Sequence, residues 1–364
     1  MSRDLLTAVW ARPDQQPLLG SRDWEVLLGQ ARRAHLLGRL AAQHRDKGWL
    51  LGVLVKPRLH LESGLRLADR QQHEVRWEVD CIVRALKRLA TPVVLLKGAA
   101  YLMADLPAAR GRLFSDIDIL VPRQSIESAE GELFAAGWIS DERDPYNQRY
   151  YRQWMHEVPP LRHVQRNTYI DLHHTITPPT SRFKVDGKRL LDRIVPLPGY
   201  PGLFVLAPAD MVLHSAVHLF QEGEFDHGLR DLLDLKDLLH HFSQEADFWP
   251  NLLDRATELG LQIPLFHALF HIQRLFGYAP PPQWAARIAA FAPPAPLRLL
   301  MAWLLGLALR PDHPSCDIRW TGLARWLLYV RSHALRMPLH LVIPHLIRKA
   351  WMRQFPEKAA TAAK

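Results

Sequence analysis

Two aspartates alternate with aliphatic residues in the first third of this 364-residue chain. The run Leu113–Val121 reads Leu-Phe-Ser-Asp-Ile-Asp-Ile-Leu-Val. Because successive side chains of a strand point to opposite faces, the alternation predicts that Asp116 and Asp118 share one face while the isoleucines point into a core. Two carboxylates at such a position repel each other and lose hydration, which costs free energy. A divalent cation held by both carboxylates removes this cost. The alternative is a strand that runs out into a solvated loop carrying two acids.

An apolar run that ends in Lys-Gly precedes this segment, and a helical pattern follows it. Residues Thr91–Gly98 read Thr-Pro-Val-Val-Leu-Leu-Lys-Gly, and Ala99–Met103 has helical composition. This order predicts a strand, a tight turn at Gly98 and the start of a helix, whose free N–H groups would form an anion site beside Lys97. Downstream, Gln124–Ala136 carries apolar residues at helical spacing and stops before a glycine.

A second alternating segment supplies a further carboxylate. Asn167–Thr175 reads Asn-Thr-Tyr-Ile-Asp-Leu-His-His-Thr, so Asp171 and His173 are expected to share one strand face. A third acid on a neighbouring strand suits metal-assisted nucleotidyl transfer, because it completes a two-metal site and accepts the proton of an attacking hydroxyl. The alternative is a structural acid paired with Arg162 or Arg166 of the expected hairpin.

The order of these segments resembles the DNA polymerase beta-like nucleotidyltransferase superfamily. The matching motifs are Lys-Gly at 97–98, Arg-x-x-Ser-Asp-x-Asp at 112–118 and Ile-Asp-Leu-His at 170–173. More narrowly, the chain resembles an uncharacterised bacterial nucleotidyltransferase family that is often encoded near exopolysaccharide and exosortase genes. The resemblance covers about residues 90–240, including the later segment Leu206–His218.

The resemblance implies a fold, a metal and a substrate. The fold is a small mixed sheet with flanking helices. The metal is Mg²⁺ (or Mn²⁺), held by the three expected catalytic acids, Asp116, Asp118 and Asp171. The substrate is a nucleoside triphosphate lying along the Gly98 turn, and an unspecified hydroxyl acceptor receives the nucleoside monophosphate. The residues expected to bind the nucleotide are Lys97, Gly98, Ala99, Arg112 and Ser115.

The turn departs from the superfamily at one position. Most active members have Gly-Ser there, and the serine hydroxyl contacts the nucleotide phosphates, whereas this chain has Gly98-Ala99. Lys97 or Arg112 is then expected to supply the positive charge that the serine hydroxyl would otherwise have helped to position, with a surface arginine as the alternative for Arg112. The departure also leaves open a catalytically silent nucleotide-binding scaffold or sensor. An antitoxin-like nucleotidyltransferase is a third option, although such proteins are usually shorter and lack long helical arms.

Composition and periodicity predict an α+β protein in three parts. Residues 1–90 form an N-terminal helical region, 91–204 the nucleotidyltransferase core, and 205–364 a C-terminal helical region that is basic at its end. Within the core, Met155–His174 is expected to form a hairpin. In the N-terminal region, Ala31–Gln43 is expected to be one helix.

Apolar runs predict further helices, and the cysteines and the N-terminus bear on the cellular compartment of the protein. Residues about 61–89 are expected to form a long helix. Leu297–Leu309 is too short to span a bilayer and is interpreted as a buried helix. The N-terminus lacks the apolar stretch of a signal peptide, and Cys81 and Cys316 lie too far apart for a metal-type spacing. These features are typical of a cytoplasmic protein, with peripheral contact to the inner membrane as a further option.

The helical region after the core has its own polar residues. Asp210, His214 and His218 are spaced four apart and therefore share one helix face. They are either a metal-ligand set or, as the simpler alternative, a helix cap and two hydrogen-bonded histidines. Arg230 and Asp234 lie one turn apart and are expected to form an intrahelical ion pair.

Basic charge is concentrated after Leu297. Eleven lysines and arginines face three acids there, a net +8 of the chain's formal +9, and five tryptophans and tyrosines are interleaved with them. This pattern suits an anionic polymer or a membrane surface. A solvated helical face with core tryptophans is the alternative. Nucleic acid is the least expected partner, because no recognised binding module is present.

Overall fold

The computed structural model describes residues 3–15, 18–221, 223–338, 340 and 342. These residues pack into two compact units, each of which combines segments that are distant in sequence. The first unit contains the described residues of Met1–Trp77, Lys97–Phe114 and Pro208–Tyr329, and the second those of Glu78–Leu96, Ser115–Ala207 and Val330–Lys364.

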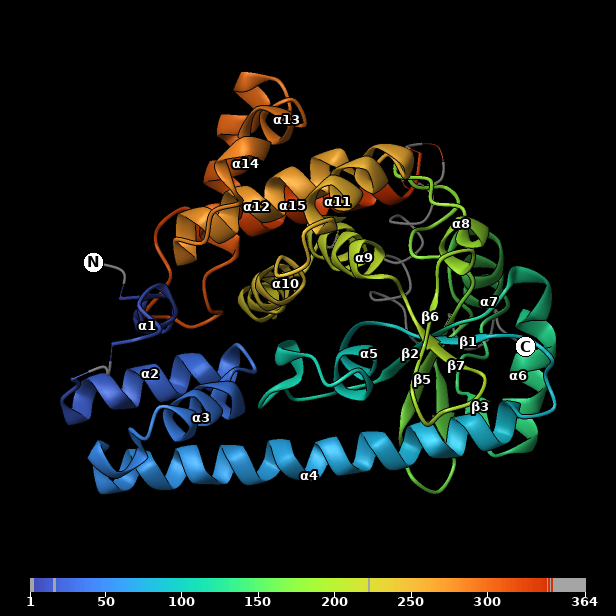
Figure 1. Ribbon diagram of the computed structural model, residues 1–364, viewed down its shortest axis with the longest axis horizontal. Coiled ribbons are helices and arrows are strands. Elements are labelled where there is room, and N and C mark those ends of the chain that lie inside the picture. Colours follow the sequence, from blue (N-terminus) through green and yellow to red (C-terminus); the bar gives the residue numbers. More distant parts are fainter. Residues whose placement is uncertain (1–2, 16–17, 222, 339, 341, 343–364) are drawn as a thin grey trace. The chain divides into compact units, whose positions relative to one another are not determined.

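The second unit is built on a seven-stranded mixed sheet (Figure 1). The strands lie in the order β3-β4-β5-β2-β1-β7-β6, in which β2–β5 and β1–β7 are parallel and the other neighbours antiparallel. Their bounds are β1 (Val93–Leu95), β2 (Ile117–Leu120), β3 (Trp138–Ser140), β4 (Leu161–His163), β5 (Tyr169–His173), β6 (Val195–Pro196) and β7 (Leu203–Val205). The expected α+β class with a mixed sheet is confirmed.

Strand burial follows the apolar runs of the sequence. All residues of β1 and β2 are buried, as expected for aliphatic strands at the centre of a sheet. The expected hairpin is present as β4 and β5, and Asn167 at its turn has φ 60°, a left-handed conformation that asparagine tolerates well. Pro159 and Pro160 interrupt the pairing with β5, because prolines have no N–H to donate. On the other side of this break, residues 156–158 pair with the end of β5.

Short helices connect and cover the strands. The described helical segments that lie wholly in this unit are η3 (Arg123–Ser125), α6 (Ile126–Ala135), α7 (Pro145–Arg149), the π-helical segment η4 (Tyr150–Trp154) and α8 (Gly187–Leu191). Helix α6 packs against β3 and β5. It ends at Gly137 with φ 100°, which confirms the glycine stop expected from the sequence.

The first unit is helical in its described residues (Figure 1). Its helices are α1 (Leu5–Ala11), α2 (Ser21–Arg33), α3 (Leu37–Asp46), η1 (Leu50–Gly52), α4 (Val55–Leu86), α5 (Lys97–Met103), η2 (Pro107–Ala109), α9 (Pro208–Gln221), α10 (Gly228–Phe242), α11 (Phe248–Glu258), α12 (Gln262–Phe276), η5 (Pro282–Trp284), α13 (Ala285–Ala289), α14 (Ala295–Ala308) and α15 (Thr321–Arg336). The ends of α4 and α15 belong to the second unit. Helix α9 is buried on nearly every side and packs against α10, α11 and α12, so it forms the centre of the unit.

Three local predictions are corrected by the structure. Ala31–Gln43 is not one helix, because His35 has φ 55° and separates α2 from α3. The left-handed residue at this turn is Lys97, the first residue of α5 (φ 45°), and not Gly98, which lies within the helix. The predicted buried helix Leu297–Leu309 is amphipathic, because several of its large apolar residues are exposed. These residues are Leu297, Leu299, Leu300 and Trp303.

Candidate metal and nucleotide site

Asp118 and Asp171 lie side by side on two parallel strands of the sheet. Asp118 of β2 pairs in register with Asp171 of β5, and paired residues point their side chains to the same face. Asp118 is buried and Asp171 is half-buried. Burial, together with the charges of Asp118 and Glu157, raises the pKa of Asp171 to about 7. The expectation that Asp171 lies on a strand beside Asp118 is confirmed, and a bound cation would neutralise this pair.

Asp116 lies outside the paired strands. Strand β2 begins at Ile117, so Asp116 precedes it, is exposed and accepts a hydrogen bond from Ser115 Oγ (2.7 Å). Asp116 is therefore not part of the β2 ladder, and the expectation that it shares a face with Asp118 stays a prediction. The charge of Asp116 nevertheless contributes to the raised pKa of Asp171.

His173 lies two residues after Asp171 and contacts two carboxylates. Its Nε2 is 3.0 Å from Asp118 Oδ1, and its Nδ1 is 3.4 Å from Glu157 Oε2. Among the described residues, His173 belongs to two sets of side chains that could hold a metal ion. These sets are Asp118–Asp171–His173 and His156–Glu157–His173. In each group the ligand atoms lie within 4.8 Å of one another.

The two arginines of the hairpin are paired with other acids. Arg162 Nε donates to Asp141 Oδ2 (2.7 Å), and Arg166 donates to both carboxylate oxygens of Glu78 (2.9 Å each). Glu78 is almost completely buried. Within the described ranges, neither Arg162 nor Arg166 pairs with Asp171, so the alternative in which one of them holds Asp171 as a structural acid is wrong.

The remaining predicted nucleotide-binding residues lie in the first unit, on or after α5. Ala99 is buried. Arg112 is buried too, and its Nε donates to Asp234 Oδ2 (2.9 Å). Burial alone would lower the pKa of Arg112, but Asp234 outweighs this effect and raises it. A Cβ on Gly98 would lie 2.8 Å from Arg112 Nη1, so the glycine lets the guanidinium pack against α5.

A small cavity adjoins this arginine within the first unit. Its volume is about 40 Å³, close to the space of one water molecule and far below that of a nucleotide. Lys97 and Arg112 both line it, together with Asp231 and Asp234. The predicted nucleotide-binding role of Lys97, Gly98, Ala99, Arg112 and Ser115 stays a prediction, and for Arg112 the geometry adds a structural role.

Several polar residues of α9 and α10 are buried inside the first unit, where they make hydrogen bonds and ion pairs. Asp210 is fully buried and accepts hydrogen bonds from Arg255 Nε (2.6 Å) and Nη2 (2.9 Å). Among the described residues, Asp210 is in no group with metal-ligand spacing, and the rings of His214 and His218 are 6.4 Å apart. The structure therefore favours the structural alternative for these three residues.

The predicted ion pair between Arg230 and Asp234 is wrong. Arg230 Nε donates to its neighbour Asp231 (2.8 Å). Asp234 instead accepts from Arg39 Nη1 (2.5 Å) and from Arg112.

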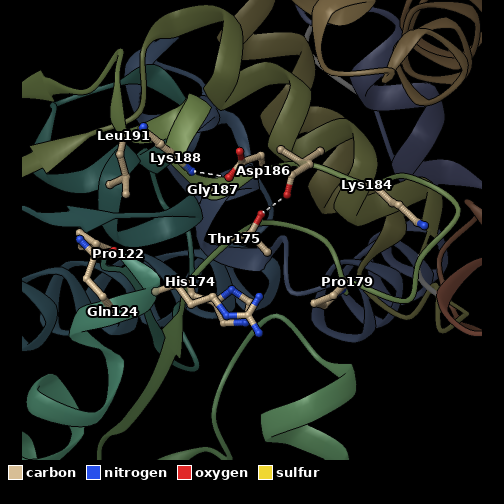
Figure 2. A pocket seen from close by; sticks show the side chains of 12 residues that line it. Pro122, Gln124, His174, Thr175, Pro179, Lys184, Asp186, Gly187, Lys188 and Leu191 are labelled. Atoms are coloured by element: carbon tan, nitrogen blue, oxygen red, sulfur yellow. Dashed lines mark hydrogen bonds between the residues drawn. The ribbon is translucent and has the colours of Figure 1, made fainter.

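A cavity of about 640 Å³ opens at the carboxyl ends of β2 and β5 (Figure 2). Thr175, which follows β5, donates a hydrogen bond to Val185 O (2.6 Å) across the cavity wall. Gly187 lies so close to the backbone after β5 that a Cβ would be 2.1 Å from His174 O. Ligands often bind at the carboxyl ends of parallel strands, and basic side chains suit an anionic ligand. The basic side chains that line the cavity are Arg123, Lys184 and Lys188.

Sequence reasoning did not find His156, Glu157 or this cavity. The only signal for the first two was a His-Glu pair shortly before Pro159-Pro160. The register of that segment against β5, which brings Glu157 opposite His173, is set by tertiary pairing.

The basic C-terminal region is only partly described. No described helix is long and apolar enough to cross a membrane. Several residues of the charged and aromatic segment after Leu297 lie outside the described residues. They are Arg348, Lys349, Trp351, Arg353, Glu357, Lys358 and Lys364.

Comparison with known families identifies the general activity. A family model described as uncharacterised nucleotidyltransferase matches residues 20–277, which is well over half of the chain. No curated protein and no solved structure matches the chain. The family match supports nucleotidyl transfer as the general activity and agrees with acids on neighbouring strands of a mixed sheet. The chain belongs to the uncharacterised nucleotidyltransferase family.

Proposed function

We propose that the protein is a nucleotidyltransferase that depends on Mg²⁺ or Mn²⁺ and transfers a nucleoside monophosphate to a hydroxyl group of a small molecule, a sugar or a protein. The acceptor oxygen forms a bond to the α-phosphorus of a nucleoside triphosphate. The bond between the α-phosphorus and the bridging oxygen breaks, and pyrophosphate leaves. The acceptor's proton passes to a carboxylate of the protein.

The observation that carries this proposal is the registered pair Asp118–Asp171. Two carboxylates on one sheet face, with the pKa of Asp171 raised to about 7, are strained by their own repulsion. Carboxylate oxygens are the ligands that Mg²⁺ prefers, so the residues present fit this metal. When bound, the metal neutralises charge on the triphosphate and lowers the barrier to attack.

The acids have different roles in this proposal. Asp118 is buried and held by His173, so it acts first as a fixed metal ligand. Asp171 is more accessible than Asp118 and lies beside it on the same sheet face, so it is the carboxylate that accepts the acceptor's proton. Asp116 is exposed at the entrance of β2 and is proposed as an additional ligand when the nucleotide binds.

The test is calorimetric binding of Mg·ATP and the other Mg·nucleoside triphosphates to the full chain. Asp118→Asn should lose nucleotide binding, whereas Asp171→Asn should keep much of the affinity and lose transfer. Asp141→Asn, an exposed acid of the same unit, is the matched control and should match the wild type. Equal affinity of Asp118→Asn and wild type would refute the site assignment.

Thermal melting without nucleotide separates catalytic from structural roles for Asp171. Removing one of two crowded carboxylates should leave the metal-free protein as stable as the wild type, or more stable. A large loss of stability in Asp171→Asn would make Asp171 a structural acid.

A catalytically silent nucleotide sensor is the second candidate, favoured by the turn in the first unit. Ala99 is buried and offers no hydroxyl, and Arg112 is engaged with Asp234. Incubation of the protein with labelled nucleoside triphosphates and cell extract distinguishes the two functions. Label transferred to a product, and lost in Asp171→Asn, would exclude the sensor.

A further inference from the structure

We propose that His156, Glu157 and His173 form a separate site for a divalent transition metal, of which Zn²⁺ is the prototype. The site contains two imidazoles and one carboxylate. Imidazole nitrogen is a favoured ligand for zinc and its neighbours, whereas Mg²⁺ prefers oxygen. The site shares His173 with the group Asp118–Asp171–His173, but it offers two imidazoles and one carboxylate, whereas that group offers two carboxylates and one imidazole.

The distances between the ligand atoms suit such an ion. In a tetrahedral site with bonds of about 2.1 Å, the ligand atoms lie roughly 3.4 Å apart. The distance from His173 Nδ1 to Glu157 Oε2 is 3.4 Å, and that from His156 Nε2 to the same oxygen is 3.8 Å. Three protein ligands with a further position for water or substrate are typical of a reactive zinc site.

The second nitrogen of His173 supports the assignment. Metal-bound histidines usually donate their other ring N–H to a carboxylate, which fixes the tautomer. His173 Nε2 lies 3.0 Å from Asp118 Oδ1, and a proton donated there leaves a lone pair on Nδ1, which lies 3.4 Å from Glu157 Oε2. His173 would then connect the two metal positions.

The backbone holds these three residues in place. Glu157 pairs opposite His173, and His174 N donates to His156 O (2.9 Å). The side chains of His156 and Glu157 are 16% and 18% exposed, so an ion can reach them from solvent.

The experiment uses the full chain, stripped of metal with a chelator and titrated with Co²⁺ as the probe. We expect one equivalent of Co²⁺ to give the visible d–d bands of a low-coordinate site. Zn²⁺ should abolish these bands at equal concentration, whereas a large excess of Mg²⁺ should leave them unchanged. His156→Ala and Glu157→Gln should weaken Co²⁺ binding by at least about 100-fold, the upper end of what even supporting residues contribute.

His174→Ala is the matched control. His174 is the neighbour of His173 but lines the cavity of Figure 2, so its replacement should leave the Co²⁺ bands intact. Asp171→Asn should also keep the bands. Because the assay contains no nucleotide, the transfer reaction and this site can fail independently. The proposal is overturned if the bands are absent, if His156→Ala and Glu157→Gln retain them, or if Mg²⁺ displaces Co²⁺.

Discussion

Replacing Asp234 with asparagine should strongly destabilise the first unit. The side chain of Asp234 is 3% exposed and accepts hydrogen bonds from two guanidiniums, those of Arg39 and Arg112. Asparagine has nearly the same shape but carries no charge and only one acceptor oxygen. The guanidinium of Arg39 would then keep only its contact with Asp237, and that of Arg112 only the nearby charge of Asp231.

The magnitude follows from the burial of all three side chains. Removing one partner of a buried pair typically costs about 3–5 kcal/mol, because the remaining charge stays desolvated. For a unit of this size, about 2–4 °C of melting temperature is lost per kcal/mol, so Asp234→Asn should melt roughly 6–20 °C below the wild type. The assay is thermal unfolding followed by circular dichroism, without nucleotide.

An exposed ion pair of the same unit provides the control. The side chains of Asp254 and Arg287 are 70% and 36% exposed, so Asp254→Asn should cost less than about 1 kcal/mol. If Asp234→Asn melts within about 2 °C of the wild type, the structural role of this network is refuted. Arg112 would then be free to act on the nucleotide, as its motif predicts.

Three further predictions concern other parts of the first unit. Gly98→Ala should destabilise it by about 1–3 kcal/mol, measured by urea unfolding, because the added Cβ meets Arg112 at 2.8 Å; unchanged stability would show that the guanidinium moves aside. Burial lowers the pKa of His271 to about 3. Its unfolded form takes up a proton below pH 6.5 while the folded form stays neutral, so stability is full above pH 6.5 and falls with the pH. His271→Leu should therefore remove about 2 kcal/mol of the stability difference between pH 7.5 and pH 5, and an unchanged pH dependence would contradict this. Trp326 is 59% exposed on α15, and if this helix binds an anionic membrane surface, Trp326→Ser should weaken co-sedimentation with anionic vesicles; equal binding would exclude this face.

Local patterns predicted two strands and the placement of Asp171. Alternation identified β2 and β5, and the Ile-Asp-Leu-His motif placed Asp171 on the strand that pairs with β2. The bounds of β2 were less predictable, because the strand begins only at Ile117 and strand ends depend on tertiary hydrogen bonds rather than on alternation.

Long-range ion pairs could not be predicted from spacing. Asp234 was expected to pair within its own helix, yet its partners Arg39 and Arg112 come from distant segments. Asp210 likewise pairs with Arg255. Helical spacing describes only neighbours along one helix, whereas a buried carboxylate is held by whichever guanidinium the packing brings to it.

Because β2 and β5 pair in parallel, the distance between Asp118 and Asp171 is set by the sheet and not by the chain that connects the two strands. Neighbouring strands lie about 4.8 Å apart whatever the length of their connection, so the spacing of Asp118 and Asp171 is independent of the segment that contains α6, β3, α7, η4 and β4. That segment carries His156 and Glu157 and can gain or lose residues at its turns without moving the two acids. In the proposed reaction, changes in that segment would alter the surroundings of the acceptor while the spacing of the two carboxylates stays the same.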